Sequence, residues 1–494
     1  MMRELLWGGA TASSQYEGGF SEGGKGLDTQ DVRPYLPRTS NATTETRLLT
    51  SSSVVRAKED IERGSGNYPF QRGTMGYYHL DEDIQLLKEL GIDIYRFSIS
   101  WARLFPEGDE EVPNESGLAY YDRVFEAVAA AGMKTFLTLT HYAVPLNLVE
   151  KYGGWTNRRL IDLYERFARV VFERWGDRID YYLPFNEINA GYFSPWNGVA
   201  LPKPEEGVYD QSKVFQSLHN QFVASARVIR LQREIAPRSQ SGCMVAAFCY
   251  YPHTMSPEDN LLKLRDEQVN QWYPVDVLAN GVQPYYMDRF YREHGIEVNI
   301  EDDDLELFAR YSCDFVSFSY YSSSVLASEG NGEQTAGNLV CSIRNPYLEA
   351  TEWGWQIDPV GLRTMLNAFY DRTHKPVFVC ECGLGARDVL EEDGTIHDPY
   401  RVEYLMRHFG QIEEAQRDGV DVLGFIVWGV IDLVSAGSCE MEKRYGVVYV
   451  DADNEGMGSY RRIKKDSFSW YRDFIRSYHE TWTKERCRLS SEGL

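Results

Sequence analysis

The most constraining feature of the sequence is an eightfold alternation of short apolar segments with longer amphipathic ones. The apolar segments are continuous runs, without polar residues at every second position, which is typical of strands buried on both faces of a parallel sheet. They span residues 5–12, 92–100, 134–141, 179–187, 242–250, 313–321, 376–381 and 422–428. Eight such strands separated by helical segments predict an α/β fold of the closed (β/α)8 type, the TIM barrel.

The segments between the strands include six with clear helical periodicity. They span residues 77–91, 120–132, 157–176, 213–235, 358–373 and 400–419. No glycine-rich phosphate turn of the GxGxxG type follows a strand, which argues against an open doubly wound sheet. We therefore expect one domain over residues 1–494, with long loops after the strands. Two irregular insertions are predicted at about 29–76 and 323–350, where loops of this fold shape the active-site rim.

Charge and composition exclude several classes of function. The chain carries 51 Lys and Arg against 74 Asp and Glu, a net charge of −23, which argues against nucleic acid or an anionic membrane as a partner. No apolar run reaches the length of about 18 residues that a membrane span needs, and the N-terminal segment does not resemble a signal peptide. The eight cysteines are dispersed, so we expect reduced thiols and a cytoplasmic location.

The segment VFVCECGLG, residues 377–385, puts one glutamate between two cysteines at the end of a predicted strand. Because neighbouring side chains on a strand point to opposite faces, Cys380 and Cys382 are expected to face one way and Glu381 the other. The one-residue spacer does not match the Cys-x-x-Cys spacing of redox and zinc motifs. We therefore expect no metal site here and attribute the chemistry to the glutamate.

Catalytic groups of a (β/α)8 barrel lie at the carboxyl ends of its strands. Glu187 ends the fourth predicted strand and Glu381 ends the seventh, and these strands lie nearly opposite each other around the ring. A single glutamate at such an end is more often an ion-pair partner. Two opposed carboxyl groups about 5–5.5 Å apart are what glycoside hydrolysis with retention of configuration requires, and Arg96 is available to keep one of them ionised.

Several motifs resemble glycoside hydrolase family 1, a family of retaining β-glycosidases on a (β/α)8 barrel. PFNEINA (184–190) is similar to the family's TFNEP motif and VCECGLGA (379–386) to its ENG motif, and further family motifs follow in order along nearly the whole chain. The resemblance implies that Glu187 is the acid/base and Glu381 the nucleophile. It implies substrate-binding roles for Arg96, Tyr321, Asn186, Gln15, His141 and Trp428. The chain departs from the family with Cys382 for Asn, Pro184 for Thr and Ser319 for Asn.

The segment after the eighth strand bears on the substrate. Where most β-glucosidases of the family carry a Glu-Trp pair, seven residues after the strand's Trp, this chain has Ser435 and Ala436. A serine hydroxyl can donate to a 6-phosphate that a carboxylate would repel. With Lys443 and Tyr445 downstream, the arrangement resembles the Ser…Lys-x-Tyr phosphate site of 6-phospho-β-glycosidases. A pair of solvated rim charges is the alternative interpretation of Lys443 and Arg444.

The sequence thus predicts a hydrolase of 6-phospho-β-D-glucosides, such as cellobiose 6-phosphate or aryl β-glucoside 6-phosphates, that acts through a glycosyl-enzyme intermediate and without a cofactor. The alternatives within the enzyme class are a 6-phospho-β-galactosidase and an unphosphorylated β-glucosidase. The alternative from outside the enzyme class is a non-catalytic sugar-phosphate-binding barrel. A cysteine-dependent redox enzyme is a third alternative. The resemblance also implies a functional link to a sugar phosphotransferase uptake system, and leaves assembly into a homo-oligomer open.

Overall fold

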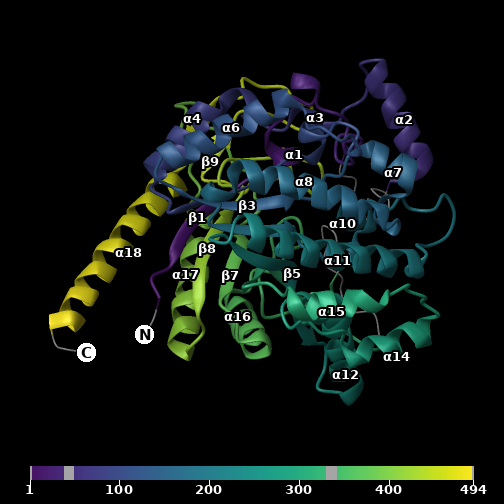
Figure 1. Ribbon diagram of the computed structural model, residues 1–494. Coiled ribbons are helices and arrows are strands. Elements are labelled where there is room, and N and C mark those ends of the chain that lie inside the picture. Colours follow the sequence, from purple (N-terminus) through teal and green to yellow (C-terminus); the bar gives the residue numbers. More distant parts are fainter. Residues whose placement is uncertain (1–2, 38–48, 330–341, 492–494) are drawn as a thin grey trace.

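The computed structural model describes residues 3–37, 49–329 and 342–491, and its centre is a closed barrel of eight parallel strands (Figure 1). The strands follow one another around the ring in chain order, each hydrogen-bonded to the next, and the eighth pairs with the first. This confirms the predicted fold class. The strands are β1 (Leu6–Ala10), β2 (Ile94–Ser98), β3 (Lys134–Thr140), β4 (Tyr181–Phe185), β5 (Gln240–Pro252), β6 (Phe315–Leu326), β7 (Val377–Cys382) and β8 (Val422–Trp428).

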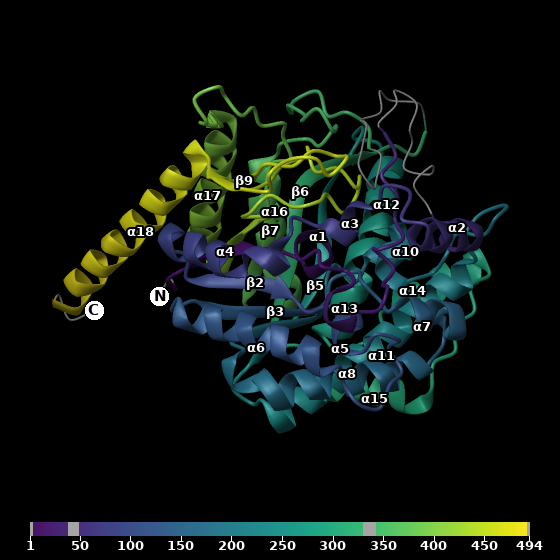
Figure 2. The same cartoon turned by 90° about the horizontal axis from the view of Figure 1, so that it is seen from above.

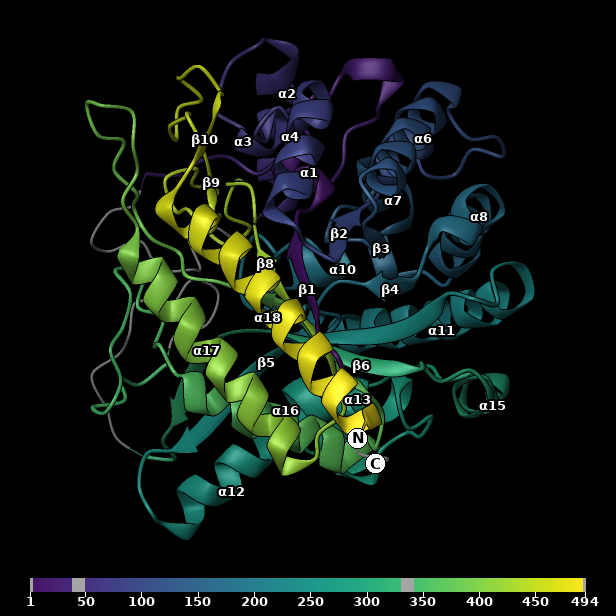
Figure 3. The same cartoon turned by 90° about the vertical axis from the view of Figure 1, so that its left-hand side faces the viewer.

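All six predicted helices are present on the outside of the barrel. Helices α6, α8 and α11 follow one another around its outer face (Figure 3). Their apolar stripes pack on the strands, since the buried residues of α8 recur at the helical spacing from Leu160 to Trp175. The six are α4 (Gly76–Leu90), α6 (Glu115–Ala130), α8 (Arg159–Trp175), α11 (Gln211–Ile235), α16 (Pro359–Thr373) and α17 (Pro399–Asp418).

The barrel interior is filled by side chains from alternate strands and is not a pore. Phe136 of β3 and Phe378 of β7 meet across it, with ring centroids 5.1 Å apart, and Phe315 of β6 packs against both. The guanidinium of Arg96 lies 5.9 Å above the Phe136 ring. The aromatic layer therefore forms the floor on which the polar groups at the carboxyl ends of the strands rest.

The two predicted insertions are only partly irregular. Residues 29–76 include helix α2 (Ser51–Glu62) and the short helix α3 (Pro69–Arg72), so the prediction of an irregular stretch is wrong there. The serines and threonine that suggested a loop instead cap a helix, because the Thr50 side chain accepts a hydrogen bond from the Ser53 amide. The second insertion begins later than predicted, since β6 continues to Leu326. Residues 38–48 and 330–341 lie outside the described part of the chain.

Strand β7 contains a bulge that overturns the predicted side-chain directions around Glu381. Val379 pairs with Phe318 but the next paired residue is Glu381, so Cys380 is an extra residue in the register. As a result Cys380 and Glu381 both point into the barrel. Cys382 points outward, with its sulfur 3.4 Å from the hydroxyl of Tyr404 on α17. The predicted arrangement, with both cysteines on one face, is wrong because a bulge breaks the strict two-residue alternation.

The last helix, α18 (Asp466–Ser491), packs beside α17 (Figure 2) and crosses over β1 (Figure 3). The Trp7 ring meets Phe474 edge-on at 4.8 Å, and the Tyr478 hydroxyl accepts a hydrogen bond from the Leu5 amide. Within the described ranges, no helix combines the length and apolar character needed to cross a membrane. The six cysteines that the structure describes are buried free thiols.

Candidate active site

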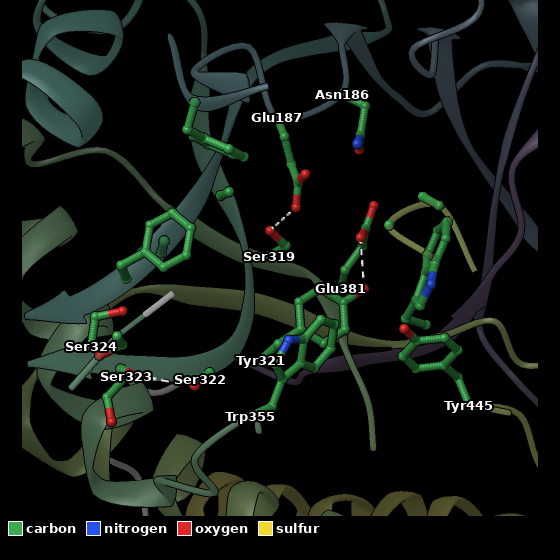
Figure 4. A pocket seen from close by; sticks show the side chains of 18 of the residues that line it. Asn186, Glu187, Ser319, Tyr321, Ser322, Ser323, Ser324, Trp355, Glu381 and Tyr445 are labelled. Carbon is green, nitrogen blue, oxygen red and sulfur yellow. Dashed lines mark hydrogen bonds between the residues drawn. The ribbon is translucent and has the colours of Figure 1, made fainter. Parts of the chain in front are cut away.

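A cavity opens at the carboxyl ends of the strands and contains both predicted catalytic glutamates. Glu187 follows β4 and Glu381 lies near the end of β7, so their carboxyl groups approach the same space from two sides (Figure 4). The serines of β6 lie to one side of the pair and Tyr445 to the other. The cavity therefore has room for a sugar on one side of the glutamates and a leaving group on the other.

Glu381 is held as a carboxylate by a cation and a phenol. Arg96 Nη1 lies 2.6 Å from Glu381 Oε1 in a buried ion pair, and the Tyr321 hydroxyl donates to Oε2 at 2.8 Å. The same guanidinium bonds the Asn186 side-chain oxygen through Nη2 at 2.7 Å and Thr138 through Nε at 3.0 Å. Each oxygen of Glu381 thus receives a donor, while its lone pairs face the cavity, as a nucleophile requires.

Among the described residues, Glu187 is hydrogen-bonded to neutral groups only. Its two carboxyl oxygens accept hydrogen bonds from the Ser319 hydroxyl and the Tyr142 hydroxyl, one on each oxygen. The residue is 8% exposed and has a left-handed backbone, with φ of 35°. Burial without a neighbouring cation disfavours the charged form of a carboxyl group.

The pKa values of the two glutamates differ in a way that suits acid/base and nucleophile roles. Burial first, and then the charge of Glu381, raises the pKa of Glu187 from 4.5 to about 8. Burial also raises the pKa of Glu381, but the Arg96 ion pair and the Tyr321 hydrogen bond act against that rise. Near neutral pH, Glu187 therefore keeps a proton to donate, while the Arg96 cation favours the ionised form of Glu381.

Among the predicted sugar-binding residues, His141, Asn186 and Trp428 line the cavity, whereas Gln15 is buried but does not line it. The His141 and Trp428 rings stack with centroids 5.2 Å apart and an interplanar angle of 17°. Burial and the nearby Arg96 charge lower the pKa of His141 well below its usual range, so this ring is neutral and can donate and accept hydrogen bonds. Gln15 Nε2 donates to the Val434 carbonyl. Gln15 Oε1 and Asn186 Nδ2 are buried without a hydrogen-bond partner among the described residues, as expected for groups that await a ligand.

The predicted phosphate-site residues come together in the loop after β8. Ser435 Oγ lies 3.4 Å from the Tyr445 hydroxyl, and both residues are buried. The Lys443 ammonium lies 3.6 Å from the centre of the Trp355 ring and 5.6 Å from that of Tyr445. Tyr445 lines the cavity, and the other two lie directly behind its wall. The structure thus favours a local cluster over the alternative of solvated rim charges, because Lys443 is fully buried.

Several lining residues were missed by the sequence interpretation. Tyr142 directly follows His141 at the end of β3, so the strand-end rule could have found it. Ser319 was noted as a departure from the family pattern but not as a partner of Glu187. Trp355 and Phe193 lie outside the strands and Phe248 lies within β5, and no pattern in the sequence marks them as cavity residues.

An acid and a nucleophile at the ends of nearly opposite strands suit a glycosidase, and sequence comparison agrees. The family model of Glycosyl hydrolase family 1 matches residues 1–480, so the chain belongs to that family and is a glycosidase. Within the described ranges no group of three or more His, Cys, Asp or Glu residues could hold a metal ion.

Individual relatives cover the whole length of the chain. It is 44% identical over 480 residues to the aryl-phospho-β-D-glucosidase BglH of Bacillus subtilis (strain 168), covering 97% of each chain. It is also 44% identical over 483 residues to a 6-phospho-β-glucosidase of Dickeya chrysanthemi, covering 97% of this chain and 98% of the other. Among solved structures, the family 1 β-glucosidase from Thermotoga maritima superposes with a TM-score of 0.79 at 28% identity, covering 97% and 98% of the two chains.

Proposed function

We propose that this glycosidase hydrolyses 6-phospho-β-D-glucosides, with cellobiose 6-phosphate and aryl β-glucoside 6-phosphates as representative substrates. The observation that carries the proposal is the cluster of Ser435, Lys443 and Tyr445 at one end of the cavity that holds Glu187 and Glu381. Two hydroxyl groups and an ammonium suit a phosphate dianion. The two 44% identical relatives, an aryl-phospho-β-D-glucosidase and a 6-phospho-β-glucosidase, support the same substrate class.

The proposed reaction is a double displacement. Glu381 attacks the anomeric carbon while Glu187 gives its proton to the leaving oxygen, which forms a glycosyl ester at Glu381 and releases the aglycone. Glu187, now a carboxylate, then takes a proton from water, and the resulting hydroxide displaces Glu381 from the sugar. Asn186 Nδ2 is available to donate to the sugar 2-hydroxyl, and the Trp428 face can stack on the C–H surface of the ring.

The general field of the protein makes a local phosphate site necessary. A chain of net charge −23 repels an anionic substrate at long range, and the two glutamates add to this inside the cavity. The buried Lys443 and the hydroxyls of Ser435 and Tyr445 offset the repulsion at the phosphate itself. Burial raises the pKa of Tyr445, so its hydroxyl keeps the proton that it donates.

The test compares kcat/KM on p-nitrophenyl β-D-glucoside with and without a 6-phosphate, in the wild type and in Ser435→Ala, Lys443→Met and Ser435→Glu. We expect a large preference for the phosphorylated substrate that falls at least tenfold in each variant, about the value of one charge-assisted hydrogen bond. Ser438→Ala is the matched control, because Ser438 is also buried in this loop but its hydroxyl has no hydrogen-bond partner among the described residues. Equal rates on both substrates would still be consistent with a glycosidase but would contradict the proposed phosphate site. Normal turnover in Glu381→Gln would remove the nucleophile assignment.

The alternatives have distinct signatures. A 6-phospho-β-galactosidase would prefer the galacto phosphate, but Ala436 lines the cavity where such enzymes tend to carry a tryptophan, which favours glucose. An unphosphorylated β-glucosidase would prefer the plain glucoside. A non-catalytic sugar-phosphate-binding barrel would bind either without releasing product.

We further propose a cytoplasmic location for the enzyme and a functional link to a phosphotransferase uptake system. Free thiols at the six described cysteines are consistent with a reducing compartment. Phosphorylated β-glucosides arise when uptake phosphorylates the sugar, which links this hydrolase to such a system.

A further inference from the structure

The two catalytic glutamates differ in the kind of group that holds them. Glu381 has a cation and a phenol, Arg96 and Tyr321, which stabilise one protonation state, the carboxylate. Glu187 has two neutral hydroxyls, one on each carboxyl oxygen. One comes from Ser319 of β6 (Figure 4) and the other from Tyr142 after β3. All three residues of the second group are buried and line the cavity.

The backbone around Glu187 fixes the carboxyl group between these hydroxyls. Glu187 and Tyr142 both have left-handed backbone conformations, with φ of 35° and 66°, which residues other than glycine adopt only at a cost in free energy. The peptide after Glu187 is tied to β5, since the Ile188 amide donates to the Met244 carbonyl at 2.9 Å. Asn189 exchanges two hydrogen bonds with the backbone of Ala246. The surrounding structure therefore holds both strained residues in place.

A residue that serves as acid and then as base needs partners that accept both of its protonation states. The protonated carboxyl group carries one donor, whereas the carboxylate is an acceptor at both oxygens. A hydroxyl can reverse its hydrogen bond, because it donates to a carboxylate and accepts from a carboxylic acid. Arginine or lysine can only donate, and would favour the carboxylate throughout.

We propose that Ser319 and Tyr142 are positioning residues that hold Glu187 through both halves of the reaction. The hydroxyl on the protonated carboxyl oxygen reverses its hydrogen bond as the proton leaves and returns, while the hydroxyl on the other oxygen donates throughout. This inference rests on the proposed function only in the acid/base role of Glu187. It also gives Ser319 a function in place of the asparagine that many family members carry at this position.

The experiment uses two substrates that differ in their need for a general acid. Benzyl β-D-glucoside 6-phosphate has a strongly basic leaving oxygen, whereas the 2,4-dinitrophenyl analogue departs with little protonation. In Ser319→Ala and in Tyr142→Phe we expect kcat/KM to fall at least tenfold on the benzyl substrate, a part of the 10²–10⁴-fold that general acids contribute, and less than about threefold on the dinitrophenyl substrate. Ser319→Thr keeps a hydroxyl and is expected to restore the benzyl activity.

Ser317→Ala is the matched control, because Ser317 is buried two residues earlier on β6 and donates to the Cys243 carbonyl instead of Glu187. Equal losses on both substrates in Ser319→Ala and Tyr142→Phe, or no loss on either, would overturn the positioning role. Glu187→Gln is measured beside them: if it keeps wild-type benzyl activity, the acid/base assignment fails and the inference falls with it. If the enzyme shows no preference for phosphorylated substrates, the ratio of benzyl to dinitrophenyl activity is measured on the glucosides without phosphate. The positioning role of Ser319 and Tyr142 can then be tested even if the proposed phosphate site is wrong.

Discussion

The buried acid/base should cost the protein stability, and replacing it should return that stability in a pH-dependent way. The pKa of Glu187 in the folded protein, about 8, lies above its usual value of 4.5, mainly because of burial. A group whose pKa is raised by folding contributes its full stability below the unfolded value and loses it as pH rises through the folded value. Between pH 4.5 and pH 8 the unfolded chain gives up this proton readily and the folded protein does not, so stability falls over that window.

The magnitude follows from the two pKa values. At about 1.36 kcal/mol for each tenfold change in the proton equilibrium, a rise from 4.5 to about 8 corresponds to a maximum cost of about 5 kcal/mol, reached above pH 8. Glutamine has nearly the same shape and does not ionise. The unfolding entropy of a chain of 494 residues is about 1 kcal/mol/K near the melting temperature. Glu187→Gln should therefore raise Tm by about 5 °C at pH 9 and by only about 1 °C at pH 5.

The assay is differential scanning calorimetry of the wild type and Glu187→Gln across pH 5 to 9. The effects of the other titrating groups on Tm cancel in the difference between the two proteins. Glu381→Gln is the contrasting variant, because it leaves the buried Arg96 guanidinium without its ion-pair partner and should lower Tm throughout. A Tm gain in Glu187→Gln that is the same at pH 5 and pH 9, or that shrinks as pH rises, would refute the assignment of a raised pKa to Glu187.

Three further outcomes are expected. Cys382→Ser should keep kcat/KM within about threefold of wild type, because this thiol contacts Tyr404 outside the barrel; a large loss in steady-state assays would mean that it supports Glu381. Arg96→Met should lower kcat/KM about a hundredfold or more and move the acid limb of its pH profile upward, since Glu381 loses the cation that favours its ionised form; an unmoved limb would contradict this. Phe248→Ala should lower kcat/KM on benzyl glucoside 6-phosphate about tenfold relative to the methyl glucoside, because Phe248 and Phe193 form an aromatic part of the cavity lining on which a benzyl group can pack; equal losses would contradict it.

The architecture could be predicted from the sequence because it follows from periodicity over long segments. Continuous apolar strands and amphipathic helices of 13 to 23 residues leave few alternatives to a closed parallel barrel, and the strand-end rule then points to Glu187 and Glu381. Serine-rich segments were less informative, since a run of serines is equally suited to a loop and to a helix N-terminus such as that of α2.

Features that depend on a single residue of register or on a tertiary contact could not be predicted. The bulge at Cys380 changes the direction of Cys382 without any sequence signal such as a glycine in the strand. The resemblance to the family raised doubt about the support of Glu381 when Asn is replaced by Cys382. The structure places this side chain against Tyr404, so the replacement affects the strand–helix interface instead of the nucleophile. The hydroxyls around Glu187 come from two different strands, and only the closed barrel brings them together.

Arg96 connects the two catalytic strand ends, and its geometry explains how one side chain serves both. Its Nη1 bonds Glu381 and its Nη2 bonds the oxygen of Asn186, the residue before Glu187. Because the Asn186 oxygen is engaged, its amide nitrogen must point to the cavity, where it can donate to a sugar hydroxyl but cannot accept from one. The guanidinium therefore favours the ionised nucleophile and, through Asn186, sets the polarity of the contact with the 2-hydroxyl. A lysine here would supply the charge but, lacking the planar fork, could not fix both partners at once.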